Sequence, residues 1–217
     1  MSSYYPVFLK LNGRRCVVIG GGQVALRKVQ SLLQCGARVE VVSPEVCPAL
    51  EELNSRRKIS VVGRCYRHGD LHGAFLAIAA TGDTSVNTKI EQEAEQIGVP
   101  VNIVDNKELS SFLVPSFLRR GDVTIAVSTA GRSPALARRI RTRLEKDIGV
   151  EYAALAEIVD EVRSEIKKKG IEIGAEDWQS AMDVDSMIEL LKKGEREKAK
   201  NLLLKNLEGQ GTKQAKE

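Results

Sequence analysis

Short apolar runs alternate with helical patterns through the first hundred residues. The runs predict strands at 16–19, 39–42, 59–62, 76–80 and 101–104, and the patterns between them predict helices at 24–34, 48–54 and 85–97. The run 76–80 is apolar at every position, so we expect a central strand that is covered on both faces. Alternation of this kind is typical of a parallel sheet. We therefore expect an α/β fold, a Rossmann-like doubly wound parallel sheet that ends near residue 112.

The pattern changes after residue 112. Strands at 112–119 and 123–128 are joined by a hairpin-like turn at 120–122, and Ser133 and Pro134 open a helix that runs to residue 148. This segment has too little core to stand alone, so we expect it to pack on the first domain or on a second copy. Charge-rich helices follow at 152–169, around Trp178, at 186–193 and at 195–207. The expected parts are therefore a first domain at 1–112, a hairpin-plus-helix segment at 113–150, a helical C-terminal domain at 151–208 and a disordered tail at 209–217.

Composition narrows the class of protein. Of the 217 residues, 42% are hydrophobic and 29% are charged, which is typical of a globular protein. The longest apolar run, 74–80, is too short to span a membrane, and the first residues lack the pattern of a signal peptide. The four cysteines show no metal-binding spacing, and His68 and His72 lie among glycines that favour a loop, so we expect no metal site. These features favour a cytoplasmic protein with no membrane partner.

A glycine-rich turn follows the first predicted strand, where a dinucleotide-binding fingerprint belongs. Gly20 allows a tight turn, and Gly22 lets the backbone approach a pyrophosphate. Ala25 keeps the following helix close to the sheet, and the N–H groups of the first helical turn, which includes Gln23 and Val24, face the phosphate charge. The alternative is a structural turn without a function, but the placement favours dinucleotide binding.

Further residues at strand ends are candidates for the same site. The second strand is followed by Ser43, Pro44 and Glu45. Ser43 could bind the ribose, whereas Glu45 lies two residues late for that role. No arginine is placed here to favour a 2′-phosphate, so we expect NAD ahead of NADP. Thr81 and Asn102 belong to the fourth and fifth strands and should border the cofactor cleft, because ligands lie beyond the carboxyl ends of parallel strands.

Asp105 is the best single candidate for a general base. It follows an apolar strand, and partial burial would tune its acidity for proton transfer. The alternative is that Asp105 and Asn106 only cap the following turn. The spacing alone does not favour either interpretation.

Five motifs occur in the order typical of one family, and the chain resembles the precorrin-2 dehydrogenase and sirohydrochlorin ferrochelatase family, the N-terminal module of siroheme synthases, over residues 4–150. The motifs are Gly20-Gly21-Gly22-x-Val24-Ala25-x-Arg27-Lys28, Ala79-Ala80-Thr81, Val101-Asn102-x-Val104-Asp105, Phe112-x-Val114-Pro115-Ser116 and Ala126-Val127-Ser128-Thr129-x-Gly131-x-Ser133-Pro134-x-Leu136-Ala137.

The resemblance implies a specific activity. Members oxidise precorrin-2 to sirohydrochlorin with NAD as the cofactor, and many also insert ferrous iron as a second substrate to give siroheme. The family's acid/base aspartate corresponds to Asp105, and its pair of hydroxyl residues corresponds to Ser128 and Thr129, where relatives often have two serines. Members form homodimers through the segment that corresponds to 113–150. Some relatives continue into a methyltransferase domain, an activity that we expect to be absent here.

The modest net charge of +4 conceals a basic segment. Residues 119–143 hold seven arginines and one acidic residue, Asp122, which is a net charge of +6. A solvated basic helix is the ordinary explanation. The tetrapyrrole that the resemblance implies carries many carboxylates, which arginine binds through paired hydrogen bonds, and Arg132, Arg138 and Arg139 are the best candidates. Nucleic acid is not an expected partner, because the segment lacks interleaved aromatic residues.

Two other classes of function stay open beside the NAD-dependent dehydrogenase. One is a non-catalytic NAD-sensing dimer, in which nucleotide binding regulates a partner and Asp105 has no role. The weaker one is a basic dimer that binds nucleic acid, whose affinity would depend strongly on salt.

Overall fold

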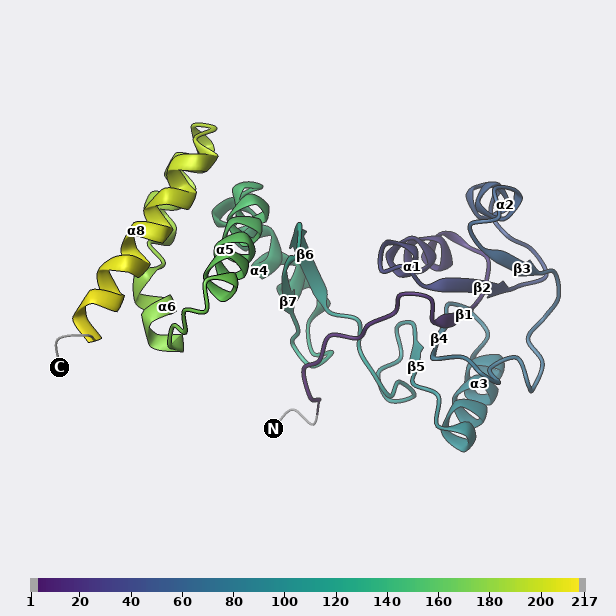
Figure 1. Ribbon diagram of the computed structural model, residues 1–217. Coiled ribbons are helices and arrows are strands. Elements are labelled where there is room, and N and C mark those ends of the chain that lie inside the picture. Colours follow the sequence, from purple (N-terminus) through teal and green to yellow (C-terminus); the bar gives the residue numbers. More distant parts are fainter. Residues whose placement is uncertain (1–3, 215–217) are drawn as a thin grey trace. The chain divides into compact units, whose positions relative to one another are not determined.

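The computed structural model describes residues 4–214, with side chains up to residue 208 (Figure 1). The chain forms two compact units, Met1–Val114 and Pro115–Glu217. Across the described residues, no helix has both the length and the apolar character needed to cross a membrane.

The first unit is built on a five-stranded parallel sheet. Its strand order is β3-β2-β1-β4-β5, and every neighbouring pair is parallel, which confirms the predicted doubly wound fold. The strands are β1 (Arg15–Ile19), β2 (Arg38–Val42), β3 (Ser60–Val62), β4 (Leu76–Ala79) and β5 (Val101–Ile103). All four residues of β4 are buried, as expected for a central strand.

Helices cover the two faces of this sheet. Helices α1 (Gln23–Gln34) and α2 (Pro48–Ser55) pack on one face, where Val29 and Leu50 are fully buried. Helix α3 (Thr84–Ile97) and the loop at 63–75 pack on the other, around Ile90 and Leu71 (Figure 1). The connections run across the faces in the manner of a doubly wound fold, so the carboxyl ends of all five strands lie at one edge.

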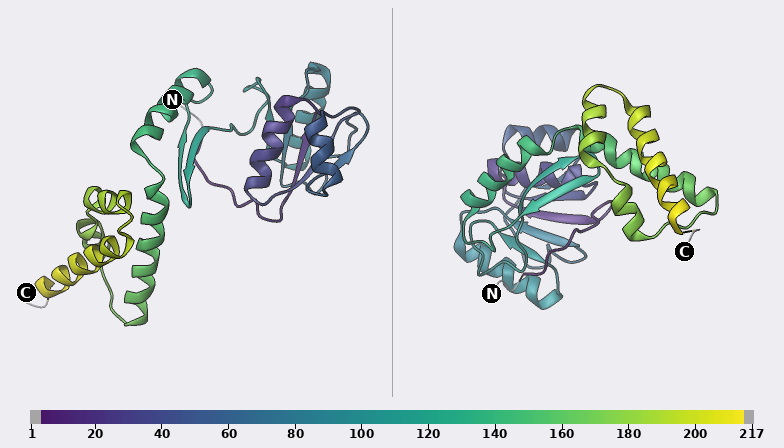
Figure 2. Two further views of the ribbon diagram at one scale, coloured as in Figure 1. Left: turned by 90° about the horizontal axis from the view of Figure 1, so that it is seen from above. Right: turned by 90° about the vertical axis from the view of Figure 1, so that its left-hand side faces the viewer.

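The second unit combines a hairpin with five helices. Its elements are β6 (Ser116–Arg120), β7 (Val123–Val127), α4 (Pro134–Asp147), α5 (Glu151–Lys168), α6 (Ala175–Ala181), α7 (Val184–Lys192) and α8 (Arg196–Gln214) (Figure 2). The two-residue turn confirms the predicted hairpin, and Gly121 in it packs against Ala153 of α5. Apart from residues 113 and 114, which belong to the first unit, the segments expected at 113–150 and 151–208 both lie in this unit.

The first hairpin strand begins later than the sequence pattern indicates. We expected it at residue 112, but it starts at Ser116, after Pro115. Phe112 instead belongs to the first unit, where its carbonyl accepts a hydrogen bond from Asn102 Nδ2 at 3.0 Å. The apolar character of Phe112 therefore reflects packing on the sheet domain.

The C-terminal helices share one core and an interhelical ion-pair network. Ile158, Met187 and Leu203 are fully buried among them. Arg196 Nη2 lies 2.7 Å from Glu161 Oε1, which joins α8 to α5. The tail expected to be disordered at 209–217 overlaps α8, which runs to Gln214, and its residues 215–217 lie outside the described part of the chain.

A buried carboxylate anchors the loop that precedes β4. Glu93 of α3 is 1% exposed, and it accepts hydrogen bonds from the backbone N–H groups of Gly69 and Leu71, both at 3.0 Å, and from the hydroxyl of Tyr66. Burial and the bond to Glu93 raise the pKa of Tyr66, so its hydroxyl stays a donor at neutral pH. One side chain thus satisfies two backbone groups and holds the loop on the sheet face.

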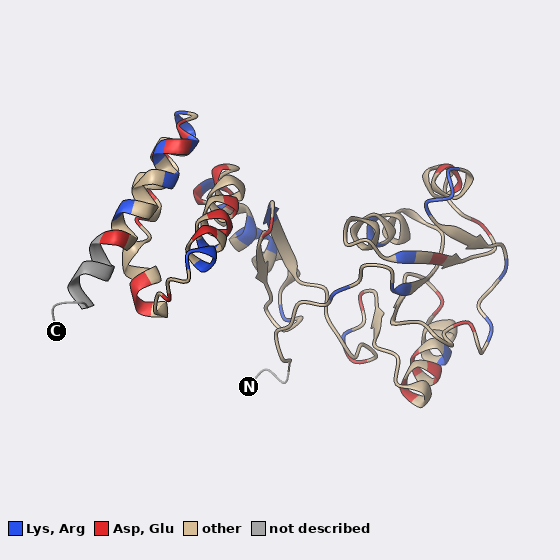
Figure 3. Cartoon of the chain, in the orientation of Figure 1, with Lys and Arg blue, Asp and Glu red and all other residues tan. Residues whose placement is uncertain are grey.

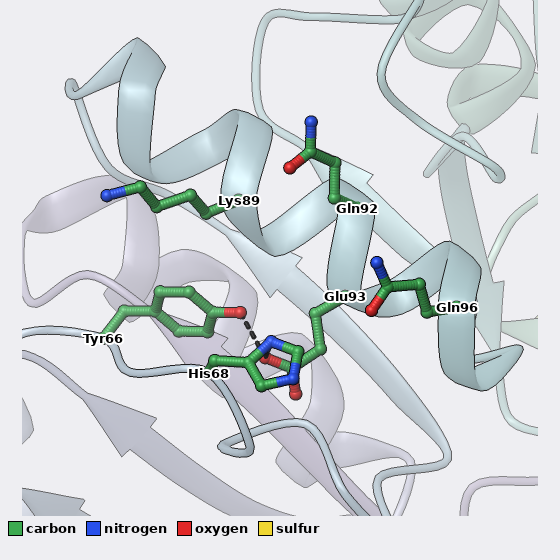
Figure 4. A pocket seen from close by; sticks show the side chains of 6 residues that line it. All are labelled: Tyr66, His68, Lys89, Gln92, Glu93 and Gln96. Atoms are coloured by element: carbon green, nitrogen blue, oxygen red, sulfur yellow. Dashed lines mark hydrogen bonds and ion pairs between the residues drawn. The ribbon is translucent and has the colours of Figure 1, made fainter.

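Both histidines lie beside this carboxylate. The Nδ1 atom of His68 is 3.5 Å from a Glu93 oxygen (Figure 4). The Nδ1 atom of His72 is 4.0 Å from the other Glu93 oxygen, and both histidines lie in a loop of turns as predicted. A cavity of about 330 Å³ here is also lined by Lys89, Gln92 and Gln96. Within the described residues no group of three or more histidine, cysteine or acidic side chains could hold a metal ion.

Replacing Glu93 should destabilise the protein strongly. In Glu93→Ala the N–H groups of Gly69 and Leu71 lose their buried acceptor, so we expect the free energy of unfolding to fall by about 3 kcal/mol. Urea unfolding followed by circular dichroism measures this change. The matched control is Glu95→Ala on the exposed face of the same helix, with a change below about 0.5 kcal/mol. Equal stability of the two variants would show that Glu93 is not an anchor.

Candidate active site

The turn between β1 and α1 is packed against both neighbouring strand ends. Gly20 has a φ of +115°, and a Cβ atom there would lie 2.4 Å from the Ala80 carbonyl oxygen, just beyond β4. A Cβ atom on Gly21 would lie 1.9 Å from the Glu45 carbonyl oxygen, beyond β2. Glycine is therefore required at both positions. The sequence pattern predicted the tight turn at Gly20 but missed the closer approach at Gly21.

Gly22 differs from the two glycines before it, because nothing lies within 4 Å of a Cβ built there. It is the N-cap of α1 and provides no side-chain cap, and the first turn of α1 holds no acidic residue. The first bonded N–H is that of Leu26, which donates to the Gly22 carbonyl at 3.0 Å. The N–H groups before it have no partner within the helix. This open, positively polarised helix end fits a dinucleotide pyrophosphate.

The other fingerprint residues follow from their positions on α1. Ala25 is fully buried against the sheet, Val24 is half-buried and Gln23 is exposed. The small side chain of Ala25 thus allows the close approach of helix and strand that the fingerprint requires.

The turn after β2 uses its hydroxyl internally. Ser43 is 7% exposed, and its Oγ donates to the Glu45 carbonyl at 2.6 Å, the same carbonyl that Gly21 approaches. Ser43 therefore shapes the wall of the glycine turn. Pro44 and Glu45 are exposed beside it.

Thr81 and Asn102 also make hydrogen bonds within the protein. Thr81, half-buried beyond β4, donates through Oγ1 to Asn87 Oδ1 at 3.0 Å, next to Asp83, whose carboxylate caps α3. Asn102 lies within β5 and is 7% exposed, and its amide is bonded to Phe112 as described above. Serine hydroxyls from the following loop, at Ser110 and Ser111, accept from β5 N–H groups at 2.9 and 2.8 Å, a role that the sequence pattern does not reveal.

Asp105 stands apart from these structural polar groups. It lies two residues beyond β5 in a turn closed by a bond from Asn106 N to the Ile103 carbonyl at 3.1 Å, and its φ is +59°. Its side chain is exposed, which corrects the expected partial burial, because the turn directs the chain away from the sheet after half-buried Val104. The capping bond, from Leu109 N at 3.1 Å, goes to Asn106 Oδ1. Asp105 makes no hydrogen bond or ion pair within the described part of the chain.

In the second unit, Ser128 and Thr129 belong to a tight loop between β7 and α4. The N–H of Arg132 donates to the Thr129 carbonyl at 3.0 Å across two left-handed residues, Ala130 and Gly131. Thr129 Oγ1 donates to the Ser133 carbonyl and accepts from the Ser133 N–H, both at 3.0 Å. Ser128 Oγ accepts from Ala130 N at 3.1 Å.

The arginines of the basic segment divide into two groups. Arg120 donates to the Ile148 carbonyl at 3.1 Å, and Arg141 pairs with Glu145, so these two support the structure. Arg119 also has internal partners, since its Nε donates to Thr124 Oγ1 at 3.4 Å and its guanidinium lies over the Phe117 ring. The remaining four are exposed, with no hydrogen bond or ion pair to any residue that the structure describes, and Figure 3 shows the basic positions on α4. This exposed group consists of Arg132, Arg138, Arg139 and Arg143.

The two families that match this chain divide it near the boundary between its two compact units. A family described as putative NAD(P)-binding matches residues 7–116, and one described as sirohaem biosynthesis protein central matches residues 120–146. The siroheme synthase of Thioalkalivibrio sulfidiphilus is 39% identical over 207 residues, which cover 94% of this chain. The chain belongs to the siroheme synthase and precorrin-2 dehydrogenase family. Its first unit is accordingly an NAD(P)-binding domain.

The match to the curated siroheme synthases covers only part of their length. The siroheme synthase of Methylobacillus flagellatus is 43% identical over 76% of this chain, but the match covers 35% of that protein, and the figure for Thioalkalivibrio is 42%. The chain thus spans about two fifths or less of these curated relatives. A solved structure titled "SirC, precorrin-2 dehydrogenase" is 26% identical, covers 95% of this chain and 100% of its own, and has a TM-score of 0.71.

Two alanine substitutions should separate the fold of the glycine turn from its binding role. Gly22→Ala adds a Cβ in open space, so we expect wild-type stability but at least about tenfold weaker NAD⁺ binding, because the methyl group occupies the phosphate approach. Gly21→Ala meets backbone at 1.9 Å, so we expect the thermal midpoint itself to fall. Calorimetric titration and thermal melts of both variants test this. Unchanged nucleotide affinity in Gly22→Ala would contradict the assigned site.

Proposed function

We propose that this chain catalyses the NAD-dependent oxidation of precorrin-2 to sirohydrochlorin in siroheme biosynthesis. The observation that carries the proposal is Asp105, an exposed carboxylate without a protein partner beyond β5 of the NAD(P)-binding domain. The family and the solved structure titled precorrin-2 dehydrogenase support the substrate class.

The reaction removes two hydrogens from the substrate, one as a hydride and one as a proton. When bound, NAD would supply the acceptor for the hydride. Asp105 accepts the proton as a general base, since a free carboxylate at the edge of the sheet can reach a substrate C–H or N–H group. The open N–H groups at the start of α1 hold the cofactor's pyrophosphate.

We infer a preference for NAD over NADP from the turn after β2. Exposed Glu45 places a negative charge there, and residues 43–45 contain no arginine or lysine to balance a 2′-phosphate. Ser43, Pro44, Thr81 and Asn102 then act as the supports of the cofactor site.

The substrate's carboxylates would be bound by the exposed arginines of the second unit, Arg132, Arg138 and Arg139, with Ser128 and Thr129 beside them. An arginine with no acid partner can form a bidentate pair with a ligand carboxylate without first breaking an internal ion pair.

Two further parts of the proposal concern assembly and iron. Leu136 and Ile140, one turn apart on α4, are 51% and 38% exposed, which supports a homodimer formed through residues 113–150. Insertion of ferrous iron, as a second substrate rather than a resident metal, stays a prediction from the family resemblance.

Asp105→Asn should abolish turnover without unfolding the protein. Asparagine adopts a positive φ about as readily as aspartate, so this variant keeps the turn that an alanine would strain. We expect NADH formation from precorrin-2 to fall by at least about 100-fold, because the general base is lost. The initial rate of NADH absorbance measures this loss.

The matched control is Asp122→Asn in the exposed hairpin turn, which should keep full activity. A non-catalytic NAD-sensing dimer predicts NAD binding with no turnover by the wild-type chain. Wild-type activity that persists in Asp105→Asn would remove Asp105 from the mechanism.

Removing a substrate arginine should affect binding rather than chemistry. In Arg132→Gln we expect the KM for precorrin-2 to rise about tenfold with kcat little changed, because a charge-assisted contact is lost in ground and transition states alike. Arg163→Gln on α5 is the control of equal charge and should leave KM unchanged. Steady-state kinetics at low salt test the pair; equal effects of the two substitutions would indicate a general charge effect.

A further inference from the structure

Most of the exposed apolar side chains lie in two stretches of the chain. Ten large hydrophobic residues are exposed within the described part of the chain, and all but Ile171 lie in residues 4–9 or 114–150. Single exposed apolar residues are ordinary, but five of them within six consecutive positions indicate a segment that packs against another surface. The second stretch contains Leu136 and Ile140, to which the homodimer proposed above gives a role. The first stretch has no role yet.

Residues 5–9, called the arm below, lack partners for both backbone and side chains. Tyr5, Val7 and Phe8 are 86%, 60% and 75% exposed, and the arm contains no charged residue. It belongs to no helix or strand, and residues 5–10 make no hydrogen bond with any described residue. A segment of this kind is suited to strand addition, which satisfies backbone groups and buries alternate side chains at the same time.

The hairpin of the second unit is open along β7. Strands β6 and β7 pair only with each other, and the backbone of β7 makes no hydrogen bond beyond that ladder with any described residue. Leu118 of β6 and its cross-strand partner Ile125 share one face, but Leu118 is 3% exposed whereas Ile125 is only half-buried. Val123 and Val127 complete this aliphatic row of β7, and they are half-buried as well. The incompletely covered strand is therefore β7.

The exposed apolar face of α4 is small for an interface between two copies. Leu136 and Ile140 are 51% and 38% exposed, which leaves on the order of 100 Å² open. A stable interface buries about 800 Å² on each partner. Tyr5 and Phe8 expose roughly 300 Å² more in each copy, before the backbone of the arm is counted. The arm is thus the larger apolar surface that a dimer can bury.

We propose that the arm of each copy adds as a third strand to the open edge of β7 in a second copy, so that the two copies exchange arms. In an added strand Tyr5, Val7 and Leu9 lie on one face, where they continue the aliphatic row of β7. Pro6 has no N–H group to donate, which an edge strand tolerates. A single copy leaves both the arm and β7 uncovered, so the added strand comes from another copy. The inference rests on the proposed homodimer and is independent of the proposed dehydrogenase activity.

Sedimentation velocity of the full chain tests the exchange. Val7→Asp places a charge in the covered row, so we expect the dissociation constant of the dimer to rise at least about 100-fold. Ile171→Asp is the matched control, because Ile171 is also β-branched and is 52% exposed but lies outside both stretches, and it should leave the constant unchanged. Circular dichroism of both variants should match the wild type, since neither side chain belongs to a buried core.

Cross-linking identifies the copy that supplies the strand. Val7→Cys and Thr124→Cys are made in separate chains of different size, both with Cys65→Ser to remove the exposed native thiol. A short bismaleimide should link the two chains in a mixture, whereas a mixture of Val7→Cys with Ile171→Cys should give no product. A link that forms only within one chain carrying both cysteines, which then sediments as a monomer, would overturn the exchange.

The outcomes separate the arm exchange from the proposals on which it builds. A wild-type chain that stays monomeric would refute both the homodimer and the exchange, without bearing on NADH formation. A dimer that is broken by Leu136→Asp but withstands Val7→Asp would keep the homodimer and refute the exchange. Two hairpins paired through their own β7 edges predict this last result.

Discussion

The first unit depends on how closely the backbone packs at the turn after β1. Gly20 packs against the Ala80 carbonyl beyond β4, and Gly21 packs against the Glu45 carbonyl beyond β2, so three neighbouring strand ends lie close together with no room for a side chain on either glycine. This contact fixes where α1 begins and leaves Gly22 as the one open position in the triplet. A pyrophosphate site at the start of α1 is then a consequence of backbone geometry and needs no charged side chain.

The polar residues around this turn have two different uses. Ser43, Thr81 and Asn102 are bonded to neighbouring protein groups and keep the strand ends in place. Asp105 lies at the same edge without such a bond. A carboxylate needed for structure would have its oxygens satisfied, as those of Glu93 are. The contrast between Glu93 and Asp105 supports the proposal that Asp105 serves a ligand.

The sequence predicted the sheet and the strand ends well, because the hydrophobic periodicity and the positions of the glycines indicate them directly. It could not separate the two uses of polar residues. Ser43 and Asn102 look like ligand contacts from their positions at strand ends, but Ser43 bonds to the Glu45 carbonyl within its own turn, and Asn102 bonds to the Phe112 carbonyl, which the fold brings to β5. The start of β6 was misplaced for a related reason, since Phe112 is apolar in order to cover the sheet and not to extend the hairpin. Long-range contacts of this kind leave no periodic signal in the chain.

Backbone strain gives independent support for where function lies. Among the described residues, three other than glycine have a positive φ: Arg57, Asp105 and Ala130. Arg57 follows the end of α2, where left-handed residues are ordinary, and its N–H donates to the Asn54 carbonyl. Asp105 and Ala130 lie in turns outside helix ends, and an alanine there costs on the order of 1 kcal/mol. These two turns carry the proposed general base and the proposed substrate loop. Glycine at both positions would allow the same fold without this strain. The strain therefore supports a functional role for the residues that these turns position, and for their rigid placement.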